Sequence, residues 1–257
     1  MAPDYRISKE NAEAFEKFMD TAKFPYEKLE KTASGIIFSS NYVSSDYIQF
    51  TKKDGEIANS SIGEFHGGKN WYNQNKEVLK KGLIEQDSAE AMAMYNAIVD
   101  AHVNGTKLYH PSKDNPLEKG DVVKESIIKD LYRQFTRDNW QNLNNFFEEN
   151  ENGILVMKKA IGLDEKGELI YSKPEVIDYL DKSSVLVNLK DFNEKGLVTK
   201  VSESKNLDRD KNIYYWKPVK NSVSRLNSDF SDPYWDGNDP DNDSSVLRVR
   251  ESLPSKQ

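Results

Sequence analysis

The residues best suited to bind a metal ion lie near the end of the sequence, in the stretch SDPYWDGNDPDND. Six aspartates and no Lys or Arg lie between Arg225 and Arg248. Ca²⁺ takes about six to eight oxygen ligands, mostly from carboxylates, carbonyls and water. The sequence therefore predicts a candidate calcium site with the ligands Asp236, Asp239, Asp241 and Asp243.

The alternating aspartates of this stretch resemble the first three ligands of an EF-hand loop. The match ends there, because the sixth position is Ser244 instead of Gly and the twelfth is Arg250 instead of Glu. Two interpretations stay open. The stretch is an irregular calcium loop, or it is a solvated turn in which Asp, Gly and Pro favour bends and Arg248 and Arg250 neutralise part of the charge.

Aromatic residues surround the same stretch. Exposed rings beside Asp and Asn are typical of carbohydrate or peptide recognition, since ring faces stack and carboxylates and amides form hydrogen bonds. If the segments are strands, one member of each aromatic group faces the core. Trp235 therefore either faces a ligand or folds back on the core. The predicted ligand-binding residues here are Trp216, Tyr234, Trp235 and Asn238.

A glycine-containing segment, GEFHGGKNWYN, supplies two further candidates, His66 and Trp71. It precedes a predicted helix, so an anion site at the helix N-terminus is one interpretation. An exposed loop that presents these side chains to a ligand is a second, and a simple helix start is the third. The segment lacks the spacing of a P-loop.

The three histidines do not cluster, and no metal-binding spacing links them. His102 continues an apolar helical row and is expected to be buried. His110 lies in a Pro-bounded segment that is expected to be exposed. The enzyme alternative is a hydrolase or transferase that combines Asp or Glu with His66 or His110 in a cleft.

The overall composition excludes several classes of protein. The 257 residues include no cysteine, which rules out disulfides and Cys-ligated zinc. The formal net charge of −7 is concentrated in the aspartate-rich stretch, so no basic stripe for nucleic acid is expected. No apolar run approaches the ~18 residues of a membrane span, and the start lacks the apolar core of a signal peptide. We expect no membrane insertion, while secreted, cell-surface, virion and cytoplasmic locations all fit.

The elements that must position these residues divide the chain near residue 150. Residues 1–150 are predicted to be mainly helical, with a β-hairpin near 36–58 around the turn at Asp54. The predicted helices cover 8–22, 70–82, 88–105, 120–135 and 138–150. The fold class predicted from this pattern is α+β with a helix-rich N-terminal half.

Residues 151–257 are predicted to be rich in strands, either as a second region or as part of one continuous domain. The strand-like segments are 153–172, 184–192, 197–201, 212–219 and 245–253. A short helix is expected at 172–182, because Ser172 and Glu175 have the spacing of a capping box. The aspartate-rich stretch is expected to be a loop between two strands.

The leading functional interpretation is a non-catalytic binding protein whose recognition surface surrounds the aromatic and acidic stretch. The ligand would be a protein or a carbohydrate, and binding would be calcium-dependent if the carboxylates hold the ion. An inhibitor of a protein partner, for example a phage-encoded one, is a further alternative. The Lys- and Asn-rich, cysteine-free composition fits a bacterial or phage protein.

Overall fold

Strands predominate in the part of the chain that the computed structural model describes, which comprises residues 47–62, 69–137, 139–229, 232–242 and 249–251. All of these residues belong to one compact unit. The predicted helix at 8–22 lies outside the described residues, as does the first part of the predicted hairpin at 36–58. No described helix is both long and apolar enough to cross a membrane.

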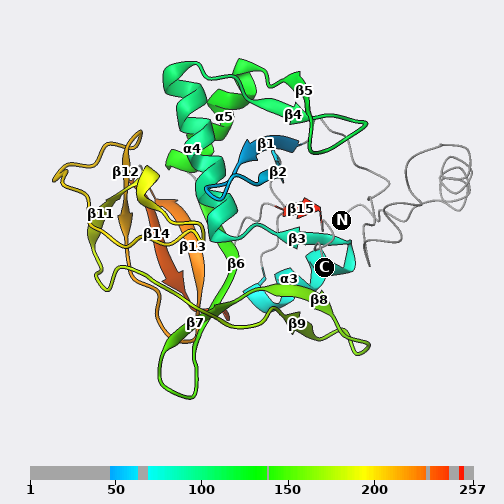
Figure 1. Cartoon of the computed structure of the whole chain (residues 1–257), viewed down its shortest axis with the longest axis vertical. Helices are drawn as coiled ribbons and strands as arrows, with labels where there is room; N and C mark the ends of the chain where they lie inside the picture. The colour runs from blue at the N-terminus through cyan, green and yellow to red at the C-terminus, as the bar shows by residue number, and fades with distance from the viewer. Residues whose placement is uncertain (1–46, 63–68, 138, 230–231, 243–248, 252–257) are drawn as a thin grey trace, which may run out of the picture. The chain divides into compact units, whose positions relative to one another are not determined.

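A four-stranded sheet has the strand order β2-β1-β4-β5 (Figure 1). Its strands are β1 (Tyr47–Thr51), β2 (Ile57–Ser61), β4 (Tyr109–Pro111) and β5 (Lys119–Val122). β1 and β2 are antiparallel and are joined by a turn in which Gly55 has a φ of 88°. Glycine suits this position because other residues rarely adopt a positive φ.

A seven-stranded sheet has the order β10-β7-β6-β13-β14-β12-β11. Its strands, in this order, are Glu175–Val176, Leu155–Lys158, Asn139–Glu149, Ser222–Asp229, Asp232–Asn238, Asn212–Tyr215 and Val185–Asn188. β12 and β14 are parallel, and the other neighbours are antiparallel. Since β6 pairs with β7 and β13, this sheet crosses the predicted boundary near residue 150.

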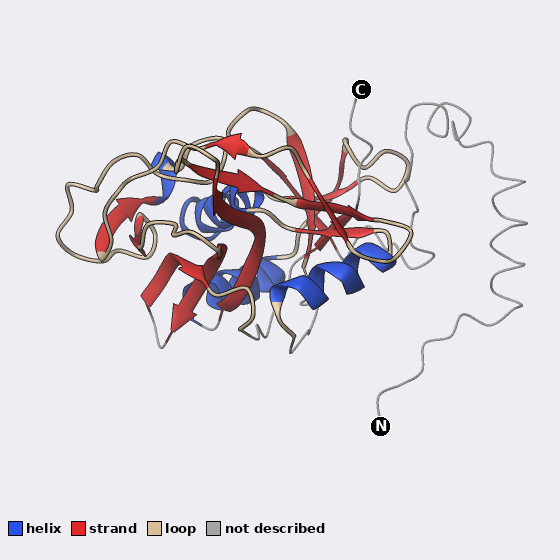
Figure 2. Cartoon of the chain, turned by 90° about the horizontal axis from the view of Figure 1, so that it is seen from below, coloured by secondary structure: helices blue, strands red, loops and turns tan. Residues whose placement is uncertain are grey.

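Two short strand pairs complete the β-structure: β15 (Val249–Glu251) with β3 (Leu83–Glu85), and β8 (Ala160–Leu163) with β9 (Leu169–Tyr171). The helices are α3 (Trp71–Lys80), α4 (Ser88–Asn104), α5 (Glu125–Arg137) and the 3-10 turn η2 (Leu189–Asp191). α4 packs on α5 and contacts β1, β6 and β13, so it touches both large sheets (Figures 1 and 2).

Helix α4 starts with a capping box. The Asp87 carboxylate accepts from the Glu90 amide, and the Glu90 carboxylate accepts from the Asp87 amide. The cap is therefore Asp87, one residue before the predicted Ser88. At the other end Gly105 has a φ of 70° and caps the helix, as the sequence predicts.

The predicted fold class, α+β with a helix-rich N-terminal half, is wrong. The structure is mostly β-sheet, with 23% helix, 36% strand and three α-helices in the described residues. The largest single error is at 138–150, where a helix was expected and the long strand β6 lies instead.

Buried amides explain why β6 does not resemble a strand in the sequence. Gln141, Asn142, Asn144 and Asn145 are at most 1% exposed, although they are polar. Asn144 both donates to and accepts from the backbone of Ala160, at 2.8 Å each. Strand prediction depends on alternation of apolar and polar residues, and the buried polar side chains of β6 hide that alternation. Buried polar groups generally have hydrogen-bond partners in folded proteins.

Three smaller predictions also fail. The helix at 172–182 is absent: Ser172 Oγ accepts from the amide of Lys159, and Glu175–Val176 pair with β7 as β10. The segment 197–201 contributes a single bridge, between Phe192 and Val198, instead of a strand. The third error concerns the site: Asp232–Asn238, expected to be part of a loop, is the strand β14.

Candidate functional site

The strand β14 lies inside the seven-stranded sheet, between β13 and β12. Successive side chains of a strand point to opposite faces. Tyr234 and Asp236 therefore share one face, and Trp235 lies on the other. The same alternation in β12 separates Tyr214 from Tyr215, which pair with Tyr234 and Trp235 respectively.

Trp235 belongs to the core. Its side chain is 0% exposed, its ring stacks on Tyr215 with centroids 5.2 Å apart, and Nε1 donates to Ser88 Oγ at 3.4 Å. Phe147 packs edge-on against the same ring. Trp235 was predicted to bind a ligand, but a side chain with no exposed surface cannot contact one. The alternative in which it folds back on the core is the observed one.

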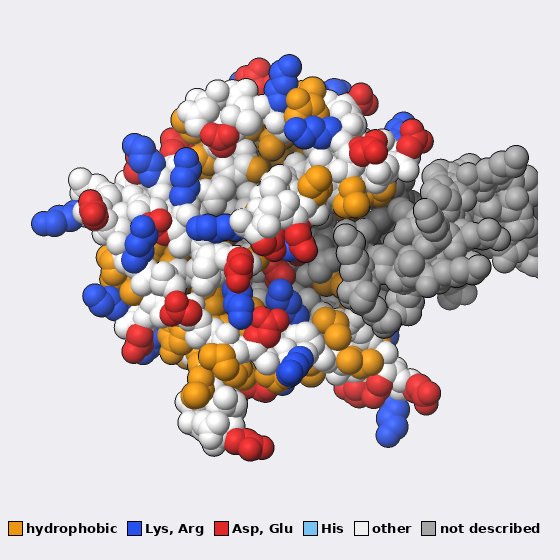
Figure 3. Space-filling view, viewed as in Figure 1, with side chains coloured by type: hydrophobic (Ala, Val, Ile, Leu, Met, Phe, Trp, Pro, Cys, Tyr) orange, Lys and Arg blue, Asp and Glu red, His pale blue; other side chains and the backbone are white. Residues whose placement is uncertain are grey.

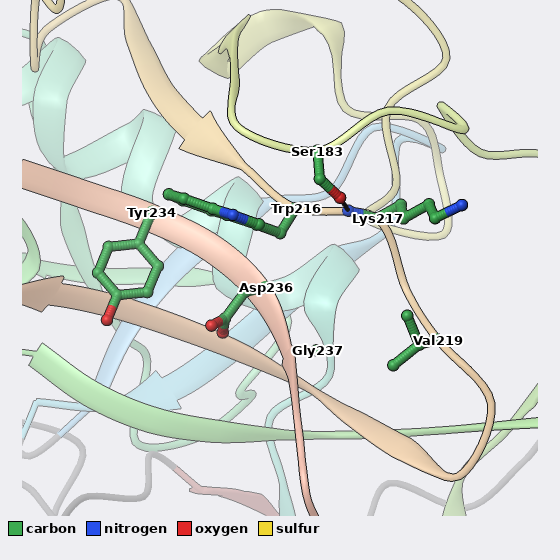
Figure 4. Close-up of a pocket in the computed structure, with 7 residues that line it drawn as sticks. All are labelled: Ser183, Trp216, Lys217, Val219, Tyr234, Asp236 and Gly237. Atoms are coloured by element: carbon green, nitrogen blue, oxygen red, sulfur yellow. Dashed lines mark hydrogen bonds between the residues drawn. The ribbon is translucent and has the colours of Figure 1, made fainter.

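A pocket lies on the opposite face of β14 (Figure 4). It has a volume of about 520 Å³, within the usual range for small-ligand sites. It is lined by Ser183, Trp216, Lys217, Val219, Tyr234, Asp236 and Gly237. Three of the predicted site residues, Trp216, Tyr234 and Asp236, are thus brought together.

An aromatic pair forms one wall of the pocket. The rings of Trp216 and Tyr234 meet edge to face, with centroids 5.4 Å apart, and Tyr214 lies 6.1 Å from Trp216. Asn227 Nδ2 donates to the Tyr234 hydroxyl at 2.6 Å, and the Trp216 amide donates to the Trp235 carbonyl at 2.9 Å. The Tyr234 ring is thus held through its hydroxyl, and the Trp216 ring is supported by its contacts with Tyr214 and Tyr234.

Asp236 provides the carboxylate of the pocket, beside the Tyr234 ring in Figure 4. Arg225 lies directly opposite on β13 and donates from Nε at 2.9 Å and from Nη2 at 2.6 Å. Burial raises the pKa of Asp236, although the guanidinium opposes this rise. The pair fixes the carboxylate and leaves its local charge balanced.

The remaining polar groups come from the segment before β11 and from the end of β12. Ser183 Oγ accepts from the Lys217 amide at 3.1 Å. The Lys217 ammonium pairs with Asp181, which raises the pKa of Lys217, and its side chain extends away from Asp236 (Figure 4). Val219, 49% exposed, adds an apolar surface.

The other predicted ligand-binding residues lie elsewhere. Trp71 is 0% exposed, and its Nε1 donates to the Leu143 carbonyl at 3.0 Å. Asn238 is 7% exposed and donates to Asn142 Oδ1 at 3.1 Å. Both side chains are buried and hydrogen-bonded within the structure, and neither lines the pocket of Trp216, Tyr234 and Asp236. His66 lies outside the described residues.

Three of the four predicted calcium ligands lie in the described residues, and these three form no metal-binding cluster. Asp236 is paired with Arg225, and Asp239 Oδ1 accepts from the Asp241 amide at 2.9 Å in a turn. Asp243 lies outside the described residues, and no cluster of three His, Asp or Glu suited to a metal occurs within the described ranges. Asp239 and Asp241 lie near Tyr72 on α3. Burial raises the pKa of Tyr72, and the negative charges of the two aspartates raise it further.

The histidines have the opposite environments to those expected. His102 is exposed and stacks on Tyr132, with ring centroids 4.0 Å apart. His110 is 8% exposed, and its Nδ1 lies 2.8 Å from the Tyr47 carbonyl oxygen. A buried and engaged His110 has little access to a substrate. The enzyme alternative therefore loses one of its two proposed bases in the described structure.

Sequence reasoning missed Arg225, Ser183 and Lys217. The signal for Arg225 was the register of a β13–β14 hairpin, which pairs it with Asp236. That signal was hidden because 232–238 resembles a loop. Arg225 neutralises Asp236; Arg248, for which a neutralising role was predicted, lies outside the described residues, as does the side chain of Arg250. No local sequence motif marks Ser183 or Lys217 as a site residue. The pairing of β11 with β12 brings the two residues close together at the pocket.

Comparisons of the chain with models of protein families, with curated proteins and with solved structures find no match. The functional argument therefore rests on the geometry of this chain alone.

Proposed function

We propose that this protein is a non-catalytic binding protein whose ligand is an uncharged carbohydrate. The recognition surface is the pocket of Trp216, Tyr234 and Asp236. The single observation that carries the proposal is the fixed aromatic pair beside a fixed carboxylate. An aromatic ring offers a flat apolar surface to the C–H face of a sugar, while the carboxylate accepts hydrogen bonds from hydroxyl groups.

The charge of the lining supports an uncharged ligand. Asp236 is balanced by Arg225, and Lys217 is balanced by Asp181. Neither an anionic nor a cationic ligand would find an unmatched charge in this lining. The Ser183 hydroxyl and the Tyr234 hydroxyl add neutral hydrogen-bonding groups, which suit sugar hydroxyls.

The lining also supports binding without hydrolysis. Glycosidases generally use two carboxylic groups on opposite sides of the scissile bond. The lining contains one carboxylate, Asp236, which is held by Arg225. Calcium is not part of the proposal, because the same carboxylate is already engaged by a guanidinium.

The test is titration with uncharged gluco-, xylo-, manno- and chito-oligosaccharides, followed by tryptophan fluorescence and calorimetry. We expect at least one series to bind, and Trp216→Ala to weaken that binding by at least about tenfold, equivalent to ~1.4 kcal/mol. Tyr109→Ala removes another half-buried aromatic residue, outside the pocket, and serves as the matched control. Addition of EDTA should leave binding unchanged. No binding by any series, or equal binding by Trp216→Ala, would refute the proposal.

A further inference from the structure

A second hollow lies along α4, between the four-stranded sheet and η2, and shares no lining residue with the Trp216 pocket. Its volume is about 550 Å³. One wall follows a single row of the helix, because Ala89, Ala93 and Ala97 repeat every four residues and line it. Over this row the helix rises about 12 Å. Because the alanine side chains are small, another molecule can approach the backbone of α4 closely along this groove.

Apolar side chains continue the surface of this groove on both sides of α4. They come from β1, from α4 itself, from the residue before β4, and from η2 and the residue after it: Phe50, Met92, Leu108, Leu189 and Phe192. All five belong to the main hydrophobic core cluster and are at most 6% exposed, so they form the floor of the groove. The groove is therefore a trough with an apolar floor, and polar residues such as Gln49, Asn96 and Asn193 complete its lining.

Four lysines surround the trough, and each comes from a different element or loop. They are Lys53, Lys107, Lys119 and Lys190, and all four are exposed. Lys53 Nζ reaches across to the Lys190 carbonyl at 3.0 Å, and Lys119 Nζ lies 4.7 Å from the centre of the Tyr109 ring. Within the described ranges, Lys107 and Lys190 form no ion pair with a carboxylate.

The lining contains one carboxylate, Asp100, which is occupied by its own helix end. Hydrogen bonds from Thr106 and Asn104, together with the charge of Lys190, lower the pKa of Asp100. Asp191, outside the lining, lies near enough to Lys53 for that charge to help lower the pKa of Asp191. Four lysines and one aspartate in the lining still give the groove an excess of positive charge in a chain whose net charge is −7. Acidic and basic side chains are interspersed over the face shown in Figure 3.

We propose that this groove docks an acidic amphipathic helix of a partner protein. The apolar face of such a helix would lie on the alanine row, as helices do in hydrophobic grooves. Its flanking Asp and Glu would face the surrounding lysines. The four lysines are exposed and lie on separate elements, so they match negative charges that are spread along a partner helix. A small anion would instead need several donors that converge on one point.

The probe is a fluorescein-labelled helical peptide with Leu along one face and Glu on both flanks, compared with a peptide in which Lys replaces Glu. We expect the protein to bind the Glu peptide and not the Lys peptide. The double variant Lys53→Glu/Lys190→Glu should weaken the Glu peptide by at least tenfold and should gain affinity for the Lys peptide. Ala93→Met, which fills the trough without a change in charge, should also weaken binding.

The matched control is Lys173→Glu/Lys205→Glu, which makes the same change in net charge at exposed positions outside the groove. It should bind the Glu peptide like the wild type. Melting temperatures verify that each variant is folded. Equal binding of both peptides, equal effects of the two double variants, or no binding at all would overturn the proposal. Groove-dependent binding to phosphatidylglycerol vesicles without binding to the peptide would assign the groove to a membrane surface and would also overturn it.

Discussion

Arg225 and Asp236 face each other across the β13–β14 ladder, and the guanidinium donates to both carboxylate oxygens. Their side chains are 20% and 16% exposed, so both charges have lost most of their water. The pair therefore links the stability of the sheet to the pocket that it borders. Removal of either partner would leave the other charge poorly solvated.

We expect Asp236→Ala to lower the free energy of unfolding by about 3 kcal/mol, because Arg225 loses the carboxylate to which Nε and Nη2 both donate. Urea denaturation measures the change. Asp181→Ala breaks the exposed pair with Lys217 and should leave stability close to that of the wild type. Equal stability of the two variants would contradict the prediction, because it would mean that the Arg225 charge is well solvated without Asp236.

The two tryptophans near the pocket should respond very differently to truncation. Trp235→Ala opens a cavity in the core and should cost about 3–5 kcal/mol. Trp216→Ala removes a half-buried ring and should cost much less. Thermal unfolding followed by circular dichroism compares the two. A Trp216→Ala variant that is as unstable as Trp235→Ala would assign Trp216 to the core as well.

Ionisation of the buried Glu85 should lower the free energy of unfolding as the pH rises. Its side chain is 0% exposed, it accepts from Asn75 Nδ2 at 2.6 Å, and burial raises its pKa well above the ordinary 4.5. Between 4.5 and the folded-state pKa, the native state binds more protons than the unfolded state, so the free energy of unfolding falls with increasing pH.

Glu85→Gln should remove this part of the pH dependence, because glutamine has no proton to lose. We expect the variant and the wild type to be similar near pH 4, and the variant to gain stability relative to the wild type as the pH rises. Urea denaturation at several pH values tests this. Glu203→Gln, the same substitution at an exposed position, is the matched control. A wild-type slope that Glu85→Gln leaves intact would contradict a buried, protonated carboxyl.

Alanine substitutions at two glycines distinguish the loss of stability caused by backbone strain from the loss caused by steric crowding. Gly196 and Gly167 have φ values of 73° and 78°, but a Cβ at Gly196 would lie 2.2 Å from the Ser88 carbonyl carbon, whereas Gly167 has open space. Gly167→Ala should cost about 1 kcal/mol from strain at positive φ. Gly196→Ala should cost clearly more, because the segment must move away from the start of α4. Equal melting temperatures for the two variants would show that the contact at Gly196 is easily relieved.

Three of the helices predicted within the described residues are present, and two, at 138–150 and 172–182, are not. The helices at 71–80, 88–104 and 125–137 have apolar residues at helical spacing, and α4 is capped at both ends by residues typical of caps. Such local signals act within one segment. They do not depend on which other segment lies beside it.

The site was predicted only in part, because its geometry depends on strand pairing. Trp216, Tyr234 and Asp236 were identified by residue type, and all three line the pocket. The partner Arg225 and the burial of Trp235 follow from the position of β14 between two strands. Asp, Asn, Gly and Pro in this strand favour turns, so local preference and final structure disagree here. The same disagreement affects β6, where buried amides replace apolar residues.

The position of β14 has a consequence for synthesis of the chain. β14 is made after β12 and β13, yet it is the strand that joins them. A nascent or truncated chain that ends before Asp232 would hold two separate half-sheets, each with an unpaired edge at β12 or β13. Unpaired edges are templates for aggregation. The last strand to join this sheet is thus also the one that protects its two halves from other chains.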